Sequence, residues 1–322
     1  MRGWFVYAGT VLLTSVVACL LFWIWQPTIS LGSFSLSLPV PVSFALPTNN
    51  EVTTLNVWLP PTHIANTIDP TAPDISASSA LVYDLTTQKI LYAKDSLTRR
   101  PMASLTKIMT AIVALEHPKP DDQYLVPQQA LVGEDSMGLS AGEVLPLSDL
   151  LYGLVLHSGN DAAETIADNF PGGRTAFIHA MNTKLATLGL SDTHFTNPTG
   201  LEGDGSQYTT ARDLLVMTRY ALIHFPEFRS IVATFDYTIP ATTTHKAYSL
   251  ENETNLISSY PGVQGVKTGY TPEAGLCLVT YLNFRGQQII GVILHSDDRR
   301  DDMKELLDYS LKKMGITPPV HG

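Results

Sequence analysis

Apolar residues are spaced in two ways between residues 78 and 315. Short apolar runs predict strands at residues 80–84 and 90–94, which the polar stretch 85–89 would join as a hairpin. Apolar positions three and four residues apart predict helices over residues 104–115, 148–156, 161–169, 175–188, 211–225 and 298–314. Strands return late in the chain, at residues 265–269, 276–283 and 287–295.

This order of elements, with strands at both ends and helices between them, predicts an α+β fold. We expect an antiparallel sheet formed from both ends of the domain and flanked by helices, with the middle helices forming a helical subdomain. Residues 78–315 would form this one globular domain and residues 316–322 a tail. At 322 residues and 44% hydrophobic composition, the chain can bury a large core and still carry an appendage.

Residues 4–25 form a run without a charged side chain. Its length suffices to cross a hydrocarbon layer about 30 Å thick. Arg2 precedes the run, so the positive-inside tendency predicts a cytoplasmic N-terminus and an outward-facing domain. We therefore expect residues 1–25 to be an uncleaved single-pass anchor. A cleaved signal peptide, or a lipoprotein cut before Cys19, are the alternatives.

Residues 26–77 are predicted to be a linker rich in Pro, Ser and Thr. Among residues 26–75, 20 of 50 belong to these three types. Residues 34–46 alternate between apolar and small or proline positions, as in a half-buried strand. Because Pro39 and Pro41 exclude a central strand, this segment is either extended on a partner surface or a disordered spacer.

Charge and composition exclude several classes of function. The chain carries 20 Lys and Arg against 30 Asp and Glu, a net charge of −10, so we expect no nucleic-acid partner. Two cysteines, Cys19 and Cys277, provide neither a disulfide framework nor a cysteine zinc site. The nine histidines form no His-x-His or His-x-x-Glu-His string, so we expect no metal and no cofactor.

The first candidate motif is Ser104-Leu-Thr-Lys107. Residues three apart share a helix face, so this spacing places a hydroxyl beside an amine. A serine hydroxyl is a weak nucleophile and needs a neighbouring base. The motif alone is weak evidence, because Ser310 and Lys313 repeat the spacing on the last predicted helix.

Two further motifs follow in a fixed order. Ser158-Gly-Asn160 begins 54 residues after Ser104, and Lys267-Thr-Gly269 begins 109 residues after Ser158 on a predicted strand. Either alone is also typical of an ordinary turn. The ordered set is much rarer, and it is the signature of the penicillin-recognising serine acyl enzymes.

Four longer segments extend this resemblance. Residues 100–111, 157–163, 197–201 and 265–271 resemble the serine D-Ala-D-Ala carboxypeptidases, the low-molecular-mass penicillin-binding proteins of peptidase family S11. The resemblance covers roughly residues 78–309. It implies a DD-peptidase/β-lactamase-like fold and removal of the terminal D-alanine from peptidoglycan stem pentapeptides. It also implies β-lactam antibiotics as covalent inhibitors and an extracytoplasmic catalytic domain, at the cell membrane if residues 1–25 are an anchor.

The resemblance also implies roles for individual residues. Ser104 would form the acyl-enzyme, Lys107 would take its proton, and Ser158 would pass a proton to the leaving amine. Burial and the nearby Lys267 cation should depress the pKa of Lys107. Backbone N–H groups of Ser104 and Tyr270 would form the oxyanion hole. The resemblance assigns substrate binding to residues in or next to the second and third motifs: Asn160, Lys267, Thr268, Gly269 and Tyr270.

Other activities of the same superfamily remain open. A D,D-endopeptidase that cuts cross-links would use the same residues. A β-lactamase would need a Glu-x-x-Leu-Asn string between the second and third motifs, and no such string occurs there. A non-enzymatic penicillin sensor would be acylated without turnover. Compared with longer relatives, we expect neither a second β domain nor a C-terminal anchor. Tyr270 stands where some relatives have histidine.

Overall fold

The computed structural model describes residues 58–60, 69–201, 205–254 and 256–321. The predicted anchor, the alternating segment at residues 34–46 and Cys19 lie outside the described residues. Within the described part of the chain, no helix has both the length and the apolar character that a membrane span requires.

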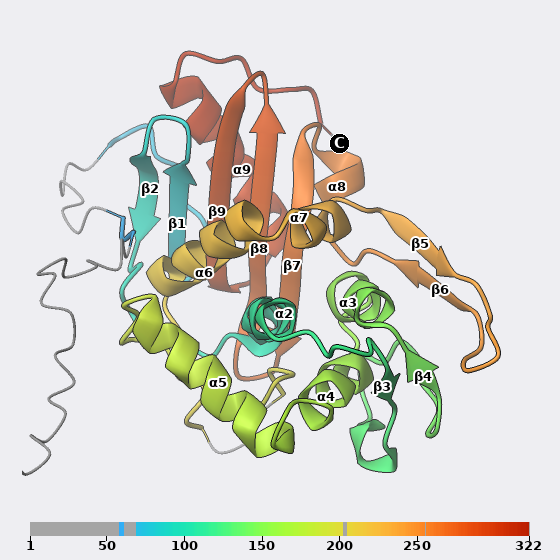
Figure 1. Ribbon diagram of the computed structural model, residues 1–322. Coiled ribbons are helices and arrows are strands. Elements are labelled where there is room, and N and C mark those ends of the chain that lie inside the picture. The colour runs from blue at the N-terminus through green and yellow to red at the C-terminus, as the bar shows by residue number, and fades with distance from the viewer. Residues whose placement is uncertain (1–57, 61–68, 202–204, 255, 322) are drawn as a thin grey trace, which may run out of the picture. The chain divides into compact units, whose positions relative to one another are not determined.

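A five-stranded antiparallel sheet lies at the centre of the domain, in the order β2-β1-β9-β8-β7 (Figure 1). Its strands come from both ends of the domain, and β1 pairs with β9, which closes the two ends together. This arrangement confirms the predicted α+β fold. The strand bounds are β1 (Ser79–Asp84), β2 (Lys89–Lys94), β7 (Val263–Thr271), β8 (Gly275–Phe284) and β9 (Gln287–Ser296).

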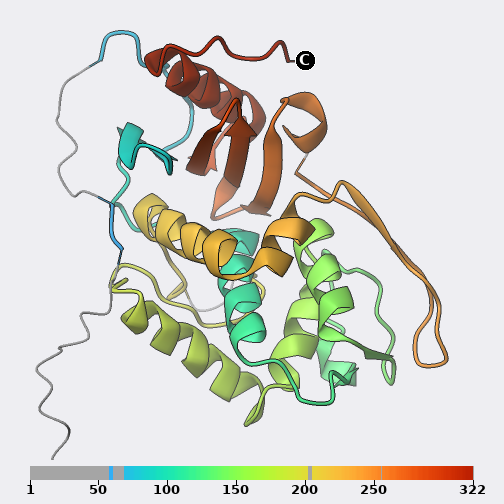
Figure 2. The ribbon, with the colours of Figure 1, turned by 45° about the horizontal axis from the view of Figure 1, so that its top comes forward.

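The sheet separates two hydrophobic cores because successive side chains of a strand point to opposite faces. Leu81 and Tyr83 of β1 face the larger core, whereas Ala80 and Val82 face the smaller one. The smaller core is covered by α9 (Arg299–Lys313), whose apolar side chains include Leu306 and Leu307 in that core. Figures 1 and 2 show α9 on one side of the sheet and α6 (Ala211–His224) on the other.

The predicted helical subdomain lies on the α6 side. At its centre is α2 (Lys107–Glu116), which packs against α3, α4, α5 and α6 (Figure 2). Nearly every position of α2 is apolar or buried, as expected for a helix surrounded by protein. The other helices here are α3 (Leu147–Leu156), α4 (Asn160–Asp168) and α5 (Gly173–Thr187).

Several short elements were not predicted. The 3₁₀ turn η1 (Ala103–Thr106) precedes α2, so Ser104 lies in this turn and not in the α-helix. Pro226, which directly follows the helix predicted over residues 211–225, begins a second helix, because proline fits the first position of a helix. The remaining elements are α7 (Pro226–Val232), α8 (Leu256–Ser259), η2 (Gln128–Ala130), and the paired strands β3 (Tyr124–Leu125) with β4 (Val144–Leu145) and β5 (Asp236–Ile239) with β6 (Tyr248–Glu251).

The end of the predicted linker packs onto the domain. Ile75 and Ala77 are buried in the smaller core. The backbone N–H groups of Ser76 and Ala77 donate to the carboxylate of Asp302 on α9, at 2.9 and 2.8 Å. The Ser76 hydroxyl donates to the same carboxylate at 2.7 Å. The chain therefore enters β1 through a polar clamp at the start of α9.

Candidate active site

Ser104 and Lys107 lie side by side where η1 passes into α2. The Lys107 Nζ atom is 2.9 Å from the Ser104 Oγ atom. Lys107 is only 1% exposed, whereas Ser104 is partly open to solvent. The spacing in the sequence therefore produces the contact that it predicts, with the amine inside the protein and the hydroxyl at its surface.

Two further oxygen atoms surround the Lys107 amine. Its Nζ atom is 2.7 Å from the Asn160 side-chain oxygen and 2.7 Å from the Thr199 carbonyl oxygen. Neither oxygen can donate a hydrogen bond. A neutral amine has two N–H donors and one lone pair, so these two acceptors use both donors and leave the lone pair for the Ser104 hydroxyl.

The environment of Lys107 favours this neutral form. Burial lowers the pKa of Lys107 well below its ordinary value, and the positive charge of Lys267 lowers it further. The carboxylates of Asp135, Glu253 and Asp161 oppose this shift with smaller effects. The direction and both causes match the expectation from the sequence.

Asn160 is held so that its oxygen faces Lys107. Its side-chain NH₂ group donates to the Glu134 carbonyl at 3.1 Å, and its backbone N–H donates to the Asp135 carbonyl at 2.7 Å. The first bond fixes which end of the amide points toward the amine. Asn160 is also the first residue of α4, so its position depends on that helix.

The loop that holds Asn160 is itself fixed by Asp161, a residue that the sequence analysis did not single out. Asp161 is fully buried, and its carboxylate accepts backbone N–H groups from Met137, Gly138 and Leu139 at 2.8–3.0 Å. The Ser136 hydroxyl donates to it at 2.6 Å. One buried carboxylate therefore organises residues 136–139 beside the site.

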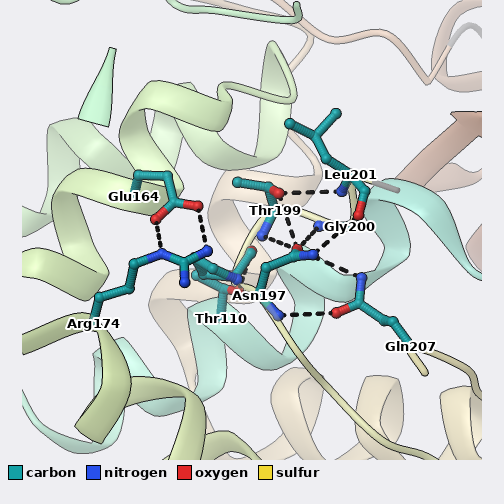
Figure 3. A network of polar contacts seen from close by, with 9 residues as sticks. Thr110, Glu164, Arg174, Asn197, Thr199, Gly200, Leu201 and Gln207 are labelled. Carbon is teal, nitrogen blue, oxygen red and sulfur yellow. Dashed lines mark hydrogen bonds and ion pairs between the residues drawn. The ribbon is translucent and has the colours of Figure 1, made fainter. Parts of the chain in front are cut away.

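The Thr199 carbonyl is positioned by a compact turn around Asn197 (Figure 3). The Asn197 side-chain oxygen accepts N–H groups from Thr199 and Gly200 at 3.1 and 2.7 Å, and its NH₂ group donates to the Leu201 carbonyl at 3.0 Å. Gly200 has a φ of +91°, and a Cβ there would overlap the Ala103 carbonyl oxygen. Only glycine fits this close approach to the turn that carries Ser104.

The third motif lies on β7, an edge strand of the described sheet. Gly269 passes so close to η1 that a Cβ would come within 3.2 Å of the Ser104 backbone nitrogen. Lys267 is 2% exposed, and burial lowers its pKa to about 8. Its Nζ atom donates to the Thr268 carbonyl at 3.1 Å. Tyr270, next along the strand, is 60% exposed and can contact a bound molecule.

Ser158 and Ala103 both adopt unusual backbone conformations near the site. Ser158 has a φ of 55° and is buried in the short connection between α3 and α4. Ala103, just before Ser104, has a φ of 47°. A residue with a side chain in this region costs about 1–3 kcal/mol, and such strain is concentrated at functional sites.

Arg299 at the start of α9 is a second residue that the sequence analysis did not predict. Its guanidinium donates to the Gly269 carbonyl at 2.9 Å and lowers the pKa of Lys267 through its positive charge. No short motif surrounds it, so only its contact with β7 in the folded domain reveals it. Among the described residues, no group of three or more His, Cys, Asp or Glu side chains could hold a metal ion.

Together, these residues can carry out acyl transfer. A hydroxyl lies beside a buried amine of depressed pKa, which can take its proton. A buried ammonium on the neighbouring strand gives the site a positive charge next to that hydroxyl, which favours a substrate with a negative group close to the bond that is attacked.

Comparison with known proteins agrees with this chemistry. The family model Peptidase_S11, described as D-alanyl-D-alanine carboxypeptidase, matches residues 66–298. A D-alanyl-D-alanine carboxypeptidase, DacF, of Bacillus subtilis is 33% identical over 75% of this chain, and the match covers 64% of that relative's length. A D-alanyl-D-alanine endopeptidase of Escherichia coli is 33% identical over 79% of this chain and 78% of its own length.

A solved structure resembles this protein in both its sequence and its fold. The crystal structure of the Streptomyces K15 DD-transpeptidase superimposes with a TM-score of 0.70 at 34% identity. The match covers 75% of this chain and 99% of that one. The described domain therefore corresponds to a whole DD-peptidase fold.

Proposed function

Since the chain belongs to the S11 family of D-alanyl-D-alanine carboxypeptidases, we propose that it removes the terminal D-alanine from peptidoglycan stem pentapeptides through an acyl-enzyme on Ser104. The observation that carries this proposal is the 2.9 Å contact between Ser104 Oγ and a buried Lys107 amine whose pKa is lowered by burial and by the Lys267 cation. It provides a nucleophile and its base within the ordered set of three motifs.

Acylation begins with a proton transfer from Ser104 Oγ to Lys107 Nζ. The oxygen attacks the carbonyl carbon of the penultimate D-alanine, and the tetrahedral oxyanion is stabilised by backbone N–H groups of Ser104 and Tyr270, each worth about 3 kcal/mol. The C–N bond then breaks as Ser158 passes its proton to the leaving nitrogen and takes up the proton held by Lys107, which becomes neutral again. Free D-alanine departs, and the rest of the peptide remains as an ester on Ser104.

Deacylation reverses the proton movements. A water molecule gives a proton to Lys107 and attacks the ester carbonyl carbon. The C–O bond to Ser104 breaks, Ser104 regains its proton, and the shortened peptide leaves with a new carboxylate. Because the Lys107 amine must accept a proton in both halves, its depressed pKa supports both steps.

Lys267 and Thr268 would bind the terminal carboxylate of the substrate. Lys267 provides the charge and Thr268 a hydroxyl, while Gly269 allows β7 to approach Ser104 closely. Asn160 would hold a substrate amide as well as Lys107, and Tyr270 would contact the peptide from the strand edge. β-Lactam antibiotics carry a carboxylate beside an amide carbonyl, so they would acylate Ser104 in the same pose.

An endopeptidase that cuts cross-links is the second candidate, because two matched relatives are named D-alanyl-D-alanine endopeptidases. Both reactions share the acyl-enzyme, and they differ only in the amine that leaves. The test is the release of D-alanine from a pentapeptide compared with the cleavage of a cross-linked dimer. We expect faster release from the pentapeptide, and preferential cleavage of the dimer would replace the carboxypeptidase assignment with the endopeptidase.

For residues 1–25 we propose an uncleaved anchor that keeps the catalytic domain outside the cytoplasm. The uncharged run at residues 4–25 and Arg2 before it support this proposal. Cell fractionation should find the full-length chain in the membrane. A shorter, soluble mature form would contradict the anchor and favour a cleaved signal peptide.

A further inference from the structure

Glu253 contacts the third motif and the residues just before the second. Its backbone N–H donates to the carbonyl of Leu156, two residues before Ser158, at 3.0 Å. Its carboxylate accepts the Thr268 hydroxyl at 3.3 Å. Glu253 therefore joins the segment before Ser158 to the strand that carries Lys267 and Thr268.

The backbone around Glu253 is firmly held. The side chain of Asn252 donates to the carbonyls of Val232 and Thr234 at 3.3 and 2.9 Å, and its oxygen accepts the Thr254 N–H at 2.9 Å. Asn252 and Thr254 are buried, whereas Glu253 between them is exposed. The buried neighbours therefore fix the position of the Glu253 backbone while its carboxylate stays exposed. An exposed carboxylate remains charged at little cost in desolvation and can interact with charges in the site.

The charge that most needs a partner here is the buried ammonium of Lys267. Its amine donates a hydrogen bond to the Thr268 backbone carbonyl, which carries no net charge. A positive charge on Arg299 or on Lys107 repels the Lys267 ammonium and so disfavours the charged form of Lys267. Two carboxylates favour it, with Glu253 having the larger effect and Asp135 the smaller one.

From these contacts we propose that Glu253 is a positioning residue that supplies the counter-charge for the Lys267 ammonium in the free enzyme, and so sets the pH range in which a terminal carboxylate is recognised. This inference rests on the proposed function, because it assigns the carboxylate clamp to Lys267. Once a substrate binds, its own carboxylate provides the counter-charge. Glu253 therefore acts on substrate capture more than on turnover.

The difference between capture and turnover gives a sharp test. The profile of kcat/KM against pH reports the free enzyme, and that of kcat reports the substrate complex. The active form of Lys267 is the charged one, so activity on a carboxylate-terminated peptide falls as the pH rises through its pKa, near 8. Glu253→Gln keeps an acceptor for Thr268 and removes the charge.

In Glu253→Gln we expect the alkaline limb of kcat/KM to move to lower pH by about one unit. At pH 8.5 this shift amounts to roughly a tenfold loss, mainly through KM, while the alkaline limb of kcat stays in place. Glu253→Asp should restore most of the wild-type profile. Glu251→Gln removes an exposed carboxylate two residues earlier on β6 and should leave both profiles unchanged.

The outcomes separate the possibilities. An unshifted kcat/KM profile in Glu253→Gln, or an equal loss at every pH, overturns the counter-charge role. If wild-type protein reacts with labelled penicillin but releases no D-alanine, the proposed function fails. The rate of penicillin acylation against pH then still tests Glu253, because penicillin also carries the carboxylate that Lys267 would bind.

Discussion

The chain contains two serine–lysine pairs with the same spacing, Ser104 with Lys107 and Ser310 with Lys313, in opposite surroundings. Lys107 is 1% exposed, whereas the Lys313 side chain is 43% exposed. Ser104 reaches solvent, whereas Ser310 is fully buried in α9. In the first pair the amine is hidden and the hydroxyl accessible, and in the second pair the accessibility is reversed.

The groups around the two amines shift the pKa values of the two lysines in opposite directions. Burial lowers the pKa of Lys107, and the Lys267 cation adds to the effect. Burial also lowers the pKa of Lys313, but Tyr309 and Asp69 outweigh it and raise the pKa overall. Lys313 Nζ lies 2.8 Å from the Tyr309 hydroxyl and 3.5 Å from the Asp69 carboxylate. The surroundings therefore lower the pKa of one amine and raise that of the other.

The two serine–lysine pairs share their spacing and differ in their surroundings. The surroundings lower the pKa of Lys107 and raise that of Lys313. Segments distant in the sequence surround Lys107: Asn160 and Thr199 contact its amine, and the charge of Lys267 lowers its pKa. On α9 the Ser310 hydroxyl has no hydrogen-bond partner among the described residues, and the Lys313 amine lies beside Tyr309 and Asp69. The following changes test this contrast.

The largest difference is expected on removal of each hydroxyl. Ser104→Ala should abolish labelling by penicillin and lower kcat by about 10⁴–10⁶-fold, since the nucleophile is lost. Ser310→Ala should retain both activities. Because it removes a buried hydroxyl without a partner, it should also raise the free energy of unfolding by about 1 kcal/mol. Labelling of the Ser104 variant would end the acyl-enzyme assignment.

Removal of each amine should give the next largest difference. Lys107→Met should lower the rate of acylation by about 10³-fold, because the general base is lost. Lys313→Met should change that rate less than about twofold and act mainly on stability, through its contacts with Tyr309 and Asp69. Acylation by labelled penicillin measures the first effect and thermal unfolding the second. Comparable acylation rates in the two variants would mean that Lys107 is not the base.

Two glycines with positive φ provide a matched backbone test. Gly200 and Gly315 have φ values of +91° and +76°, but only at Gly200 would a Cβ overlap another group, the Ala103 carbonyl. Gly200→Ala should lower kcat/KM by about 10²-fold because it displaces the turn that carries Ser104. Gly315→Ala should cost about 1 kcal/mol of stability and leave activity unchanged. Equal activity losses would show that strain, not displacement, is responsible.

The smallest effect is the pH dependence of acylation. The neutral form of Lys107 is active, so the rate should fall at acid pH as the pH drops through its lowered pKa. The charged form of Lys267 is active, so the rate should fall about tenfold per unit above pH 8. Lys313→Met should leave both limbs in place. A limb that moves in that variant would mean that Lys313 contributes to the site.

The sequence predicted the parts of the fold that depend on long periodic patterns. The hairpin at residues 80–94 and the six longer helices lie within two or three residues of their predicted bounds. The strands β3 and β4 contain two residues each, too few for any period to appear. The strands β5 and β6, four residues each, depend on contacts with α3 that a local pattern does not encode.

The site was predictable where side chains form motifs. The order of three motifs identified Ser104, Lys107 and Asn160, which the structure brings into contact. The Thr199 carbonyl carries no signal of its own, because every residue has one. Asp161 and Glu253 act through loops and charge at a distance, so their identity as site residues appears only when the fold brings those loops together.

The clamp between residues 76–77 and Asp302 determines how the domain bears tension. A pull on the chain ahead of residue 69 meets the contacts of Asp69 with Tyr309 and Lys313, then the bonds to Asp302 and then β1, which is paired on both sides by β2 and β9. Such a force acts along the strand, so many backbone bonds resist it in shear at once. The load passes into the sheet and α9 and leaves the junction of η1 and α2 outside its path. With the N-terminal anchor proposed above, tension on the chain would therefore pass into the sheet and leave Ser104 and Lys107 in place.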